Sequence, residues 1–439
     1  MGLLSFKGGI HPPHAKKSTE KKPVEQAVQP KIVVIPLQQH IGAPCEALVK
    51  AGDYVKVGQK IGEATSFVSA PVHSSVSGIV KEVSKKSTLG GKTTCVVIES
   101  DGENAISEEV KPKGDISSLD GKEILNIIKE AGIVGMGGAG FPTHVKLSPP
   151  PNKPIEFVIL NGAECEPYLT ADHRLMLESP EKIIYGLKAL MKVLDVKKGF
   201  IGIEVNKMDA LDKLTQLTEK DDSISVVGLK TKYPQGAEKQ LIYACTKRQV
   251  PSGGLPLEAG AVVSNVATAA AVSDAIKIGM PLVERICTIT GGGIKEPKNM
   301  LIKTGTLLSE IVEQCGGFTD DVGKVIWGGP MMGISMSTLE IPATKTASGI
   351  LCLTEEEAYV PDASSCIKCG KCVDICPAFI QPMLLDAYSM RRNYDQTEKL
   401  RVLDCIECGS CSFVCPAKRE LLQSIRVAKK EVLAKRKRV

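Results

Sequence analysis

The stretch "AGIVGMGGAGFPTHVKL", residues 131–147, decides how the middle of this chain folds. It contains a literal G-x-G-x-x-G at Gly135, Gly137 and Gly140. A Rossmann loop needs a strand directly before the first glycine and a helix opening after it. Here a predicted helix, residues 122–130, precedes the loop, and a proline follows closely. The order predicts a different loop, in which glycines expose backbone N–H groups to a phosphate or a flat ring.

The sequence around this loop, residues 115–284, alternates between helix and strand patterns. "IEFVILN", "GFIGIEV" and "SISVVGL" are predicted strands. "SPEKIIYGLKALMKVL" is a predicted helix with Ser179 as its N-cap and Pro180 at its first position. The alternation predicts an α/β domain with a mostly parallel sheet.

Polar residues follow the strands of this domain, at the edge where α/β sheets bind ligands. "FVILNGAECEPY", "YPQGAEKQL" and "VVSNVATAAAV" supply Asn161, Glu164, Glu166, Tyr233, Gly236, Glu238, Asn265 and Thr268. Any one of them alone has an ordinary explanation, since Asn265 could cap a helix and Glu164 could be solvated. In the glycine loop, Phe141 offers a stacking face and Lys146 a positive charge. Together these residues favour a ligand-binding loop over an empty turn.

Eight cysteines fall in two runs of C-x₂-C-x₂-C-x₃-C-P, "SCIKCGKCVDICP" and "DCIECGSCSFVCP". In such paired runs the fourth cysteine of each run binds the other cluster. The spacing therefore predicts two [4Fe-4S] clusters. One is assigned to Cys366, Cys369, Cys372 and Cys415, and the other to Cys405, Cys408, Cys411 and Cys376. Structural zinc is the weaker alternative, because it uses two C-x₂-C pairs and rarely two complete runs.

Composition limits the class of protein. A chain of 439 residues is too long for one hydrophobic core and suggests about three domains. Fifteen cysteines without an export signal argue for a reducing compartment. The net charge is +5, with acids and bases interleaved outside two basic ends, so no nucleic-acid partner is expected. No apolar run reaches the length of about 18 residues that a membrane span requires.

The remaining segments predict further domains. Residues 1–30 are polar and rich in lysine and proline, which predicts a flexible arm. Residues 31–100 resemble a lipoyl-type barrel-sandwich, whose hairpin "SAPVHSSVSG" holds His73, expected at the surface, and no carrier lysine. Residues 285–340 predict a β-grasp domain of the SLBB type. Residues 358–420 predict an α-helical two-cluster ferredoxin domain, and residues 421–439 a basic amphipathic helix, which either aids docking or is simply solvated.

Three motifs resemble the flavoprotein subunit of respiratory complex I: G-x-G-G-A-G-F-P-T-x-x-K, N-x-x-E-x-E-P and N-V-x-T. In that family they bind FMN and NADH in a fold other than the usual Rossmann unit. The resemblance implies an FMN site formed by Gly135, Gly137, Lys146, Asn161, Glu164, Glu238, Asn265 and Thr268. It implies an NAD(H) site formed by Gly138, Gly140, Phe141, Glu166 and Tyr233. The chain departs from the family pattern at Ala163, where an acid is usual, at Ser264, where asparagine is usual, and in its doubled cluster motif.

A second resemblance covers nearly the whole chain. "FKGGIHPP", "IPLQQHIGAP", the barrel-sandwich, "LNGAECEPYLTADHRLM", the β-grasp and the two cysteine runs occur in this order. This order is similar to that of the C subunits of Rnf complexes, the ion-translocating ferredoxin:NAD oxidoreductases. The resemblance implies a peripheral subunit on the cytoplasmic face of the cell membrane. It also implies as partners the membrane subunits, a ferredoxin-fed iron–sulfur subunit and NAD(H).

The implied cofactors form a chemically consistent set. NADH releases two electrons together and an iron–sulfur cluster accepts one, so FMN is expected between them. Two alternatives remain open at this point: a soluble cobalamin reductase of diol utilisation, whose chain is similarly built, and an electron-wire subunit without a working flavin site. A lipoyl-type carrier is disfavoured because no lysine stands near His73.

Overall fold

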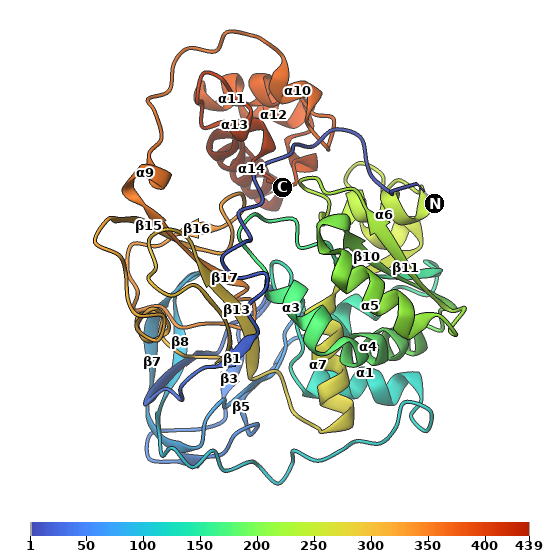
Figure 1. The fold of residues 1–439 in the computed structure, drawn as a ribbon, viewed down its shortest axis with the longest axis vertical. Coiled ribbons are helices and arrows are strands. Elements are labelled where there is room, and N and C mark those ends of the chain that lie inside the picture. The colour runs from blue at the N-terminus through green and yellow to red at the C-terminus, as the bar shows by residue number, and fades with distance from the viewer. Residues whose placement is uncertain (1, 439) are drawn as a thin grey trace.

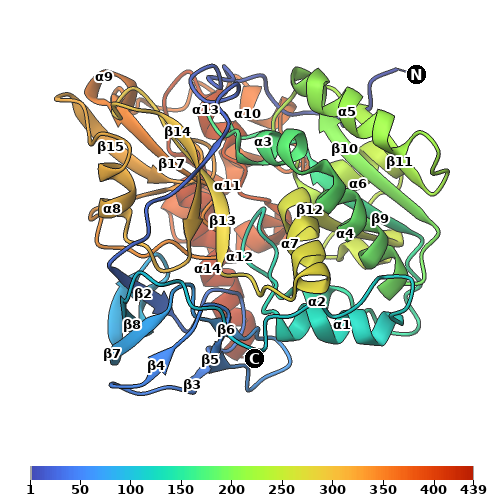
Figure 2. The ribbon, with the colours of Figure 1, turned by 60° about the horizontal axis from the view of Figure 1, so that its bottom comes forward.

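The computed structural model describes residues 2–438, with side chains as far as residue 436. A parallel α/β domain lies on one side and two β domains lie on the other, with a small helical domain packed against them (Figure 1). Figure 2 shows the barrel-sandwich strands below the β-grasp sheet, opposite the α/β domain. The multidomain α/β class expected from the sequence is confirmed.

The α/β domain is built on a four-stranded sheet in the order β11-β10-β9-β12, with every pair parallel. Its strands are β9 (Phe157–Gly162), β10 (Lys198–Glu204), β11 (Ile224–Leu229) and β12 (Ala261–Asn265). Its helices are α1 (Gly121–Glu130), α2 (Thr143–Lys146), α3 (Ala171–Glu178), α4 (Pro180–Val193), α5 (Met208–Thr218), α6 (Glu238–Thr246) and α7 (Val266–Lys277), with 3₁₀ turns η1 (Val205–Lys207) and η2 (Pro256–Ala259).

Alternate residues of β9 enter two separate cores, as the period of a strand requires. Val158 and Leu160 pack with α1, α4 and α7, whereas Ile159 packs with α6 and η2 on the other face. The two long helices α4 and α7 approach so closely that a side chain at Gly186 would overlap the backbone of Ala269. Both faces of the sheet are therefore covered, which leaves the carboxyl ends of its strands free for a site.

Local signals explain how the glycine loop begins. Helix α1 starts with a capping box in which Asp120 accepts from the Glu123 amide and Glu123 accepts from the Asp120 amide. The loop then runs from α1 to the single turn of α2, so a helix precedes it as predicted. The expected cap at Ser179 is wrong in detail. Ser179 does precede α4, but its side chain makes no cap hydrogen bond, and its own amide donates to the last turn of α3.

The barrel-sandwich consists of two small sheets. Its strands are β2 (Ile32–Pro36), β3 (Glu46–Ala47), β4 (Tyr54–Val55), β5 (Lys60–Glu63), β6 (Val72–His73), β7 (Gly78–Thr88) and β8 (Gly91–Ser100). The expectation of a surface histidine is wrong, because His73 is buried on β6 beside Glu130 and Lys345. Burial holds the pKa of His73 well below its ordinary value. The hairpin is thus covered by neighbouring domains, which also suits a structural module.

The β-grasp sheet has the order β1-β14-β13-β17-β15-β16. Its strands are β1 (Val24–Gln26), β13 (Glu284–Thr290), β14 (Lys298–Lys303), β15 (Val322–Trp327), β16 (Ile334–Ser335) and β17 (Gly349–Thr354), accompanied by α8 (Leu308–Glu313) and α9 (Glu355–Ala358). Strand β17 lies in the middle of the sheet, between β13 and β15, although it follows the expected end of the domain at residue 340. The domain therefore extends to the end of β17.

The first 30 residues are not the flexible arm that composition predicts. Strand β1 adds to the β-grasp sheet beside β14, and Leu4 and Ile10 make bridges to Leu229 and Tyr233 in the α/β domain. In Figure 1 this dark blue segment runs from the parallel sheet past the helical domain to the β-grasp sheet. Contacts with residues far away in the sequence order this polar segment, and composition alone does not predict such contacts.

The helical domain contains α10 (Lys371–Asp374), α11 (Pro382–Met390), α12 (Tyr394–Lys399), η3 (Val402–Asp404), α13 (Ser410–Phe413) and α14 (Leu421–Arg438). The basic helix α14 packs its apolar side into the domain, where Leu421, Ile425, Ala428 and Val432 are buried with the cysteines. Among the helices of residues 2–438, none is long and apolar enough to cross a bilayer.

Candidate functional site

The two cysteine runs enclose two cavities in the helical domain. One is lined by Cys366, Cys369, Cys372 and Cys415 (the outer quartet). The other is lined by Cys376, Cys405, Cys408 and Cys411 (the inner quartet). The structure thus brings together the same fours that the spacing groups. Among the residues that the structure describes, the two quartets included, no three His, Cys, Asp or Glu side chains converge closely enough to hold a single metal ion.

Both runs have the same backbone conformation. Lys368 and Glu407 have a positive φ of 57° each, and Gly370 and Gly409 follow with 78° and 76° before a single helical turn. These conformations turn amide groups toward sulfur: the Lys368 amide lies 3.4 Å from Cys366 Sγ, and the Glu407 amide lies 3.4 Å from Cys405 Sγ. N–H groups directed at thiolates stabilise their negative charge, which fits four thiolates around an iron–sulfur core.

The surroundings of the two quartets differ. Cys366 and Cys369 are exposed on the segment 359–370, which has no helix or strand. In the inner quartet three cysteines are buried and Cys405 is half-buried. Burial raises the pKa of Cys411 to about 12, so loading with iron must displace its proton.

The glycine loop folds back on itself and leaves its tip open. The Gly135 amide donates to the Phe141 carbonyl at 2.9 Å, and the Met136 amide donates to Thr268 Oγ1 at 2.9 Å. A side chain at Gly137 would meet Asn265 at 2.9 Å, whereas nothing lies within 4 Å of one at Gly138. Gly140 has a φ of 69°, which favours glycine.

The side chains at the strand ends connect the loop to the sheet. Lys146 Nζ donates to Glu238 Oε1 at 2.9 Å and to the Val263 carbonyl at 3.0 Å. Asn161 Nδ2 donates to the Gly236 carbonyl at 2.8 Å, and a side chain at Gly236 would crowd Asn161 at 3.1 Å. These contacts bring together the end of β9, the turn before α6 and the glycine loop.

Asn265 has a partner that the sequence analysis missed. Its Nδ2 donates to Asp172 Oδ2 at 2.7 Å, while its Oδ1 accepts from the Ala267 amide at 2.8 Å at the start of α7. Asp172 stands in the first turn of α3. The only available signal for it was the acidic residue opening a helix in "TADHR", which also occurs in ordinary caps.

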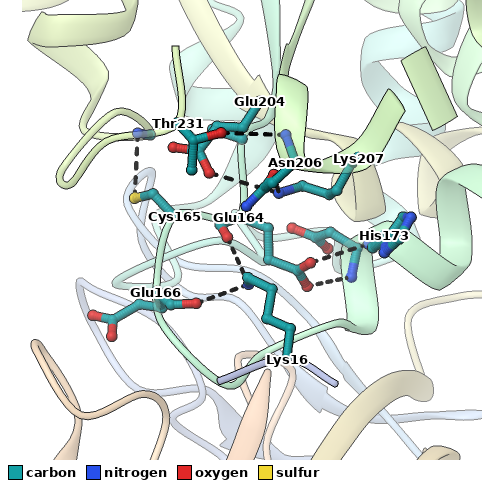
Figure 3. Close-up of polar contacts among 12 residues, drawn as sticks. Lys16, Glu164, Cys165, Glu166, His173, Glu204, Asn206, Lys207 and Thr231 are labelled. Atoms are coloured by element: carbon teal, nitrogen blue, oxygen red, sulfur yellow. Dashed lines mark hydrogen bonds and ion pairs between the residues drawn. The ribbon is translucent and has the colours of Figure 1, made fainter. Parts of the chain in front are cut away.

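The carboxylates of the two glutamates after β9 are engaged by protein groups, and Figure 3 shows the contacts of Glu164. Glu164 accepts from the amides of Asp172 and His173 at 2.7 and 3.2 Å. Glu166 accepts from the amides of Met331 and Met332 at 3.1 and 2.9 Å. Burial raises the pKa of each carboxyl to about 7. Glu166 therefore binds the turn between β15 and β16 (the β-grasp turn) to this site, a contact between domains that the motif did not reveal.

Tyr233 is also more enclosed than its expected role suggests. The residue is 1% exposed, and its hydroxyl lies 3.5 Å from Glu166 Oε1. It shares an apolar cluster with Ile10 and Cys408 of the inner quartet.

The arrangement fits the groups that the sequence implies. The open side of Gly138, exposed loop residues, the ammonium of Lys146 and converging amide side chains provide room and hydrogen bonds for a flavin phosphate or ring. Each quartet provides four sulfur donors around one cavity, which is the donor set of a [4Fe-4S] cluster.

Comparison with protein families agrees with this division of the chain. Residues 4–103 match the RnfC barrel sandwich hybrid domain, and residues 128–274 match the Nuo51 FMN-binding domain. Residues 286–335 match the SLBB domain, and residues 358–416 match the 4Fe-4S dicluster domain.

One curated relative decides the family. The chain is 52% identical to the C subunit of the Na⁺-translocating ferredoxin:NAD⁺ oxidoreductase complex of Acetobacterium woodii, over 99% of this chain and 98% of the relative. The chain belongs to the RnfC family. It is also 51% identical to the C subunit of the proton-translocating complex of Clostridium ljungdahlii, over 98% of this chain and 94% of that relative. With the C subunit of the ion-translocating oxidoreductase complex of Rhodobacter capsulatus it shares 39% identity, over 97% and 83% of the two chains.

The fold of this chain is shared in part with a solved structure. The NAD⁺-reducing [NiFe]-hydrogenase in its H₂-reduced state superposes with a TM-score of 0.51 and 17% identity, over 74% of this chain and 64% of that one. This likeness concerns the fold alone. With the family assignment, this RnfC protein is an electron-transfer subunit of a multi-subunit oxidoreductase that carries FMN and two [4Fe-4S] clusters.

Proposed function

We propose that this RnfC protein passes electrons between NAD(H) and a ferredoxin-fed iron–sulfur subunit, on the cytoplasmic face of the membrane and in contact with the membrane subunits. The names of its relatives, which couple ferredoxin and NAD⁺ to ion translocation, support this proposal. Bound FMN supplies the exchange between two-electron and one-electron chemistry. The protein holds the cofactors in order and keeps water from the path between them.

One observation carries the order of the cofactors: the inner quartet packs against the flavin domain. Cys408, Tyr233 and Ile10 share an apolar cluster. Gln240 Nε2 donates to the Pro377 carbonyl at 3.0 Å, directly after Cys376 of the inner quartet. In this proposal the inner quartet holds the cluster next to the flavin.

The outer quartet has the features of a partner-facing site. Cys366 and Cys369 are exposed, together with Ile367 between them. Lys368 and Lys371 are also exposed near this cavity, so the surface around it favours an acidic partner. In this proposal the ferredoxin-fed subunit docks here, where Cys366, Cys369, Cys372 and Cys415 would hold a cluster that supplies one-electron chemistry next to that partner.

The glycine loop and strand ends form the proposed nucleotide site. The FMN pocket is assigned to Gly135, Gly137, Lys146, Asn161, Glu164, Gly236, Glu238, Asn265 and Thr268. Gly138, Gly140 and Phe141 are assigned to NAD(H), with Tyr233 and Glu166 forming the wall between this site and the inner quartet. This role follows from the burial of Tyr233, from the contact of its hydroxyl with Glu166, and from the hydrogen bond that Glu166 accepts from the β-grasp turn.

Anaerobic titration of the cluster-loaded, FMN-loaded chain with NADH tests the proposal. We expect bleaching of the flavin absorbance followed by electron paramagnetic resonance (EPR) signals from reduced clusters. Clusters that form normally in a chain that never binds flavin would instead identify an electron-wire subunit. Loss of NADH-dependent bleaching on replacing the loop residue Gly138 by a bulky residue, with the clusters intact, would locate the nucleotide at the loop.

A further inference from the structure

Lys16 is a buried lysine of the N-terminal segment that the electron path does not use. Its Nζ donates to the backbone carbonyls of Glu164 and Glu166, each at 2.9 Å (Figure 3), and also to that of Leu169. An ammonium group has three donors, so all of them are satisfied. Burial lowers the pKa of Lys16 to about 8, which still leaves the ammonium form predominant at pH 7.

The loop that receives this ammonium has little regular structure of its own. It joins the end of β9 to the start of α3. Two of its residues, Glu164 and Tyr168, have positive φ values of 43° and 70°. Such a conformation is unfavourable for a residue with a side chain, so it persists only when its surroundings enforce it. Three carbonyl oxygens that point at one place also repel each other unless a cation lies between them, and Lys16 provides that cation.

The same loop connects three parts of the cofactor region. Glu164 accepts from the first turn of α3, Cys165 Sγ accepts from the Gly236 amide at 3.3 Å, and Glu166 accepts from the β-grasp turn. A displacement of the loop would therefore shift the Gly236 turn and the carboxyl of Glu164 together. Both belong to the proposed flavin pocket.

We propose that Lys16 is a positioning residue of the flavin pocket: its ammonium group holds residues 164–169 in the conformation that receives FMN. This inference rests on the proposed function, because the pocket is the one assigned there. It makes the N-terminal segment a part of the cofactor site, although it lies about 150 positions away from the loop in the sequence.

Other contacts hold the N-terminal segment in place without Lys16. Leu4 exchanges backbone hydrogen bonds with β11, since its amide donates to Gly228 and its carbonyl accepts from Lys230. Thr19 Oγ1 accepts from Thr170 Oγ1 at 2.8 Å, and β1 pairs with β14. Replacing Lys16 alone should therefore remove the cation while leaving the segment docked. The adjacent Lys17 is exposed and offers a matched control.

The test compares the full-length, cluster-loaded parent chain with K16M and K17M. Hydrogen exchange of residues 163–170 is measured before FMN is added, and the FMN dissociation constant afterwards. In K16M we expect exchange faster by about tenfold or more and FMN binding weaker by a similar factor, as loss of a charge-assisted hydrogen bond implies. In K17M neither quantity should change. In K16A, added n-butylammonium should restore part of both, because it replaces the missing ammonium.

The outcomes separate this inference from the proposed function. Unchanged exchange in K16M would overturn the role of Lys16, whatever FMN does. Faster exchange with unchanged FMN affinity would overturn the link between the loop and the pocket. A parent chain that binds no FMN would refute the flavin site itself, while the exchange data would still report on Lys16. If K16M does not fold, K16R gives the same test, since it keeps the charge but cannot place three N–H groups at one point.

Discussion

The two cysteine quartets share one local structure and differ in what surrounds them. Both runs place a residue with positive φ, a glycine with positive φ and a single helical turn at the same spacing. The outer quartet has two exposed cysteines, whereas the inner quartet is covered by Tyr233 and Ile10. The motif therefore determines what is bound, and the packing around it determines where that cofactor stands in an electron path.

The largest effect should come from removing one cluster at a time. C408A removes an inner ligand and should abolish reduction of the outer cluster by NADH, because the link to the flavin domain is lost. C369A removes an outer ligand and should leave reduction of the inner cluster at the parent rate. Stopped-flow absorbance and EPR measure both, and iron and sulfide analysis verifies that each variant lacks a single cluster. Normal NADH reduction of the outer cluster in C408A would break the proposed order.

The stability that Glu166 contributes, in the wall beside the inner quartet, should depend on pH. Burial raises the pKa of Glu166 to about 7 from an ordinary value of 4.5. The folded state therefore binds the proton more tightly than the unfolded state. The stability contributed by this group is complete below about pH 4.5 and is lost as the pH rises through 7.

E166Q, which has no such proton to lose, should thus gain stability relative to the parent by up to about 3 kcal/mol between pH 5 and pH 8. Urea unfolding of the parent and of E166Q at several pH values measures this difference. A difference that stays constant with pH would show that Glu166 does not bind a proton near neutrality.

A smaller contrast tests the equivalent positions Lys368 and Glu407. Glu407 accepts from Arg426 Nε at 3.0 Å and from Lys429 Nζ at 2.8 Å on α14, whereas Lys368 is exposed. E407A should lower the free energy of unfolding by about 1 kcal/mol, and K368A should change it by less than about 0.5 kcal/mol. Chemical unfolding followed by cluster absorbance measures both. Equal effects would mean that the contacts with α14 do not distinguish the two runs.

Sequence reasoning succeeded where local spacing governs the structure. Four cysteines at fixed intervals can surround a cluster in few ways, so the two groupings follow from the runs themselves. The helix before the glycine loop was predictable because its capping box and apolar periodicity lie within one segment. The alternating strands and helices likewise indicated the parallel sheet.

The sequence was not sufficient where contacts with residues far away in the chain determine the structure. The lysines of residues 1–30 resemble a solvated arm, yet Lys16 is buried among carbonyls from the loop after β9. His73 was expected at the surface, but neighbouring domains cover it. The assignment of Glu166 to NAD(H) remains a prediction, but its motif did not reveal that the β-grasp amides donate to its carboxylate. No local pattern records such contacts between domains.

The central claim is that the inner cluster lies between the flavin and the outer cluster. The most direct test is a pulsed EPR distance measurement between the one-electron-reduced flavin and the reduced cluster that remains in C369A and in C408A. The account predicts a shorter distance in C369A, which retains the inner cluster. An equal distance in the two variants, or a shorter one in C408A, would contradict it.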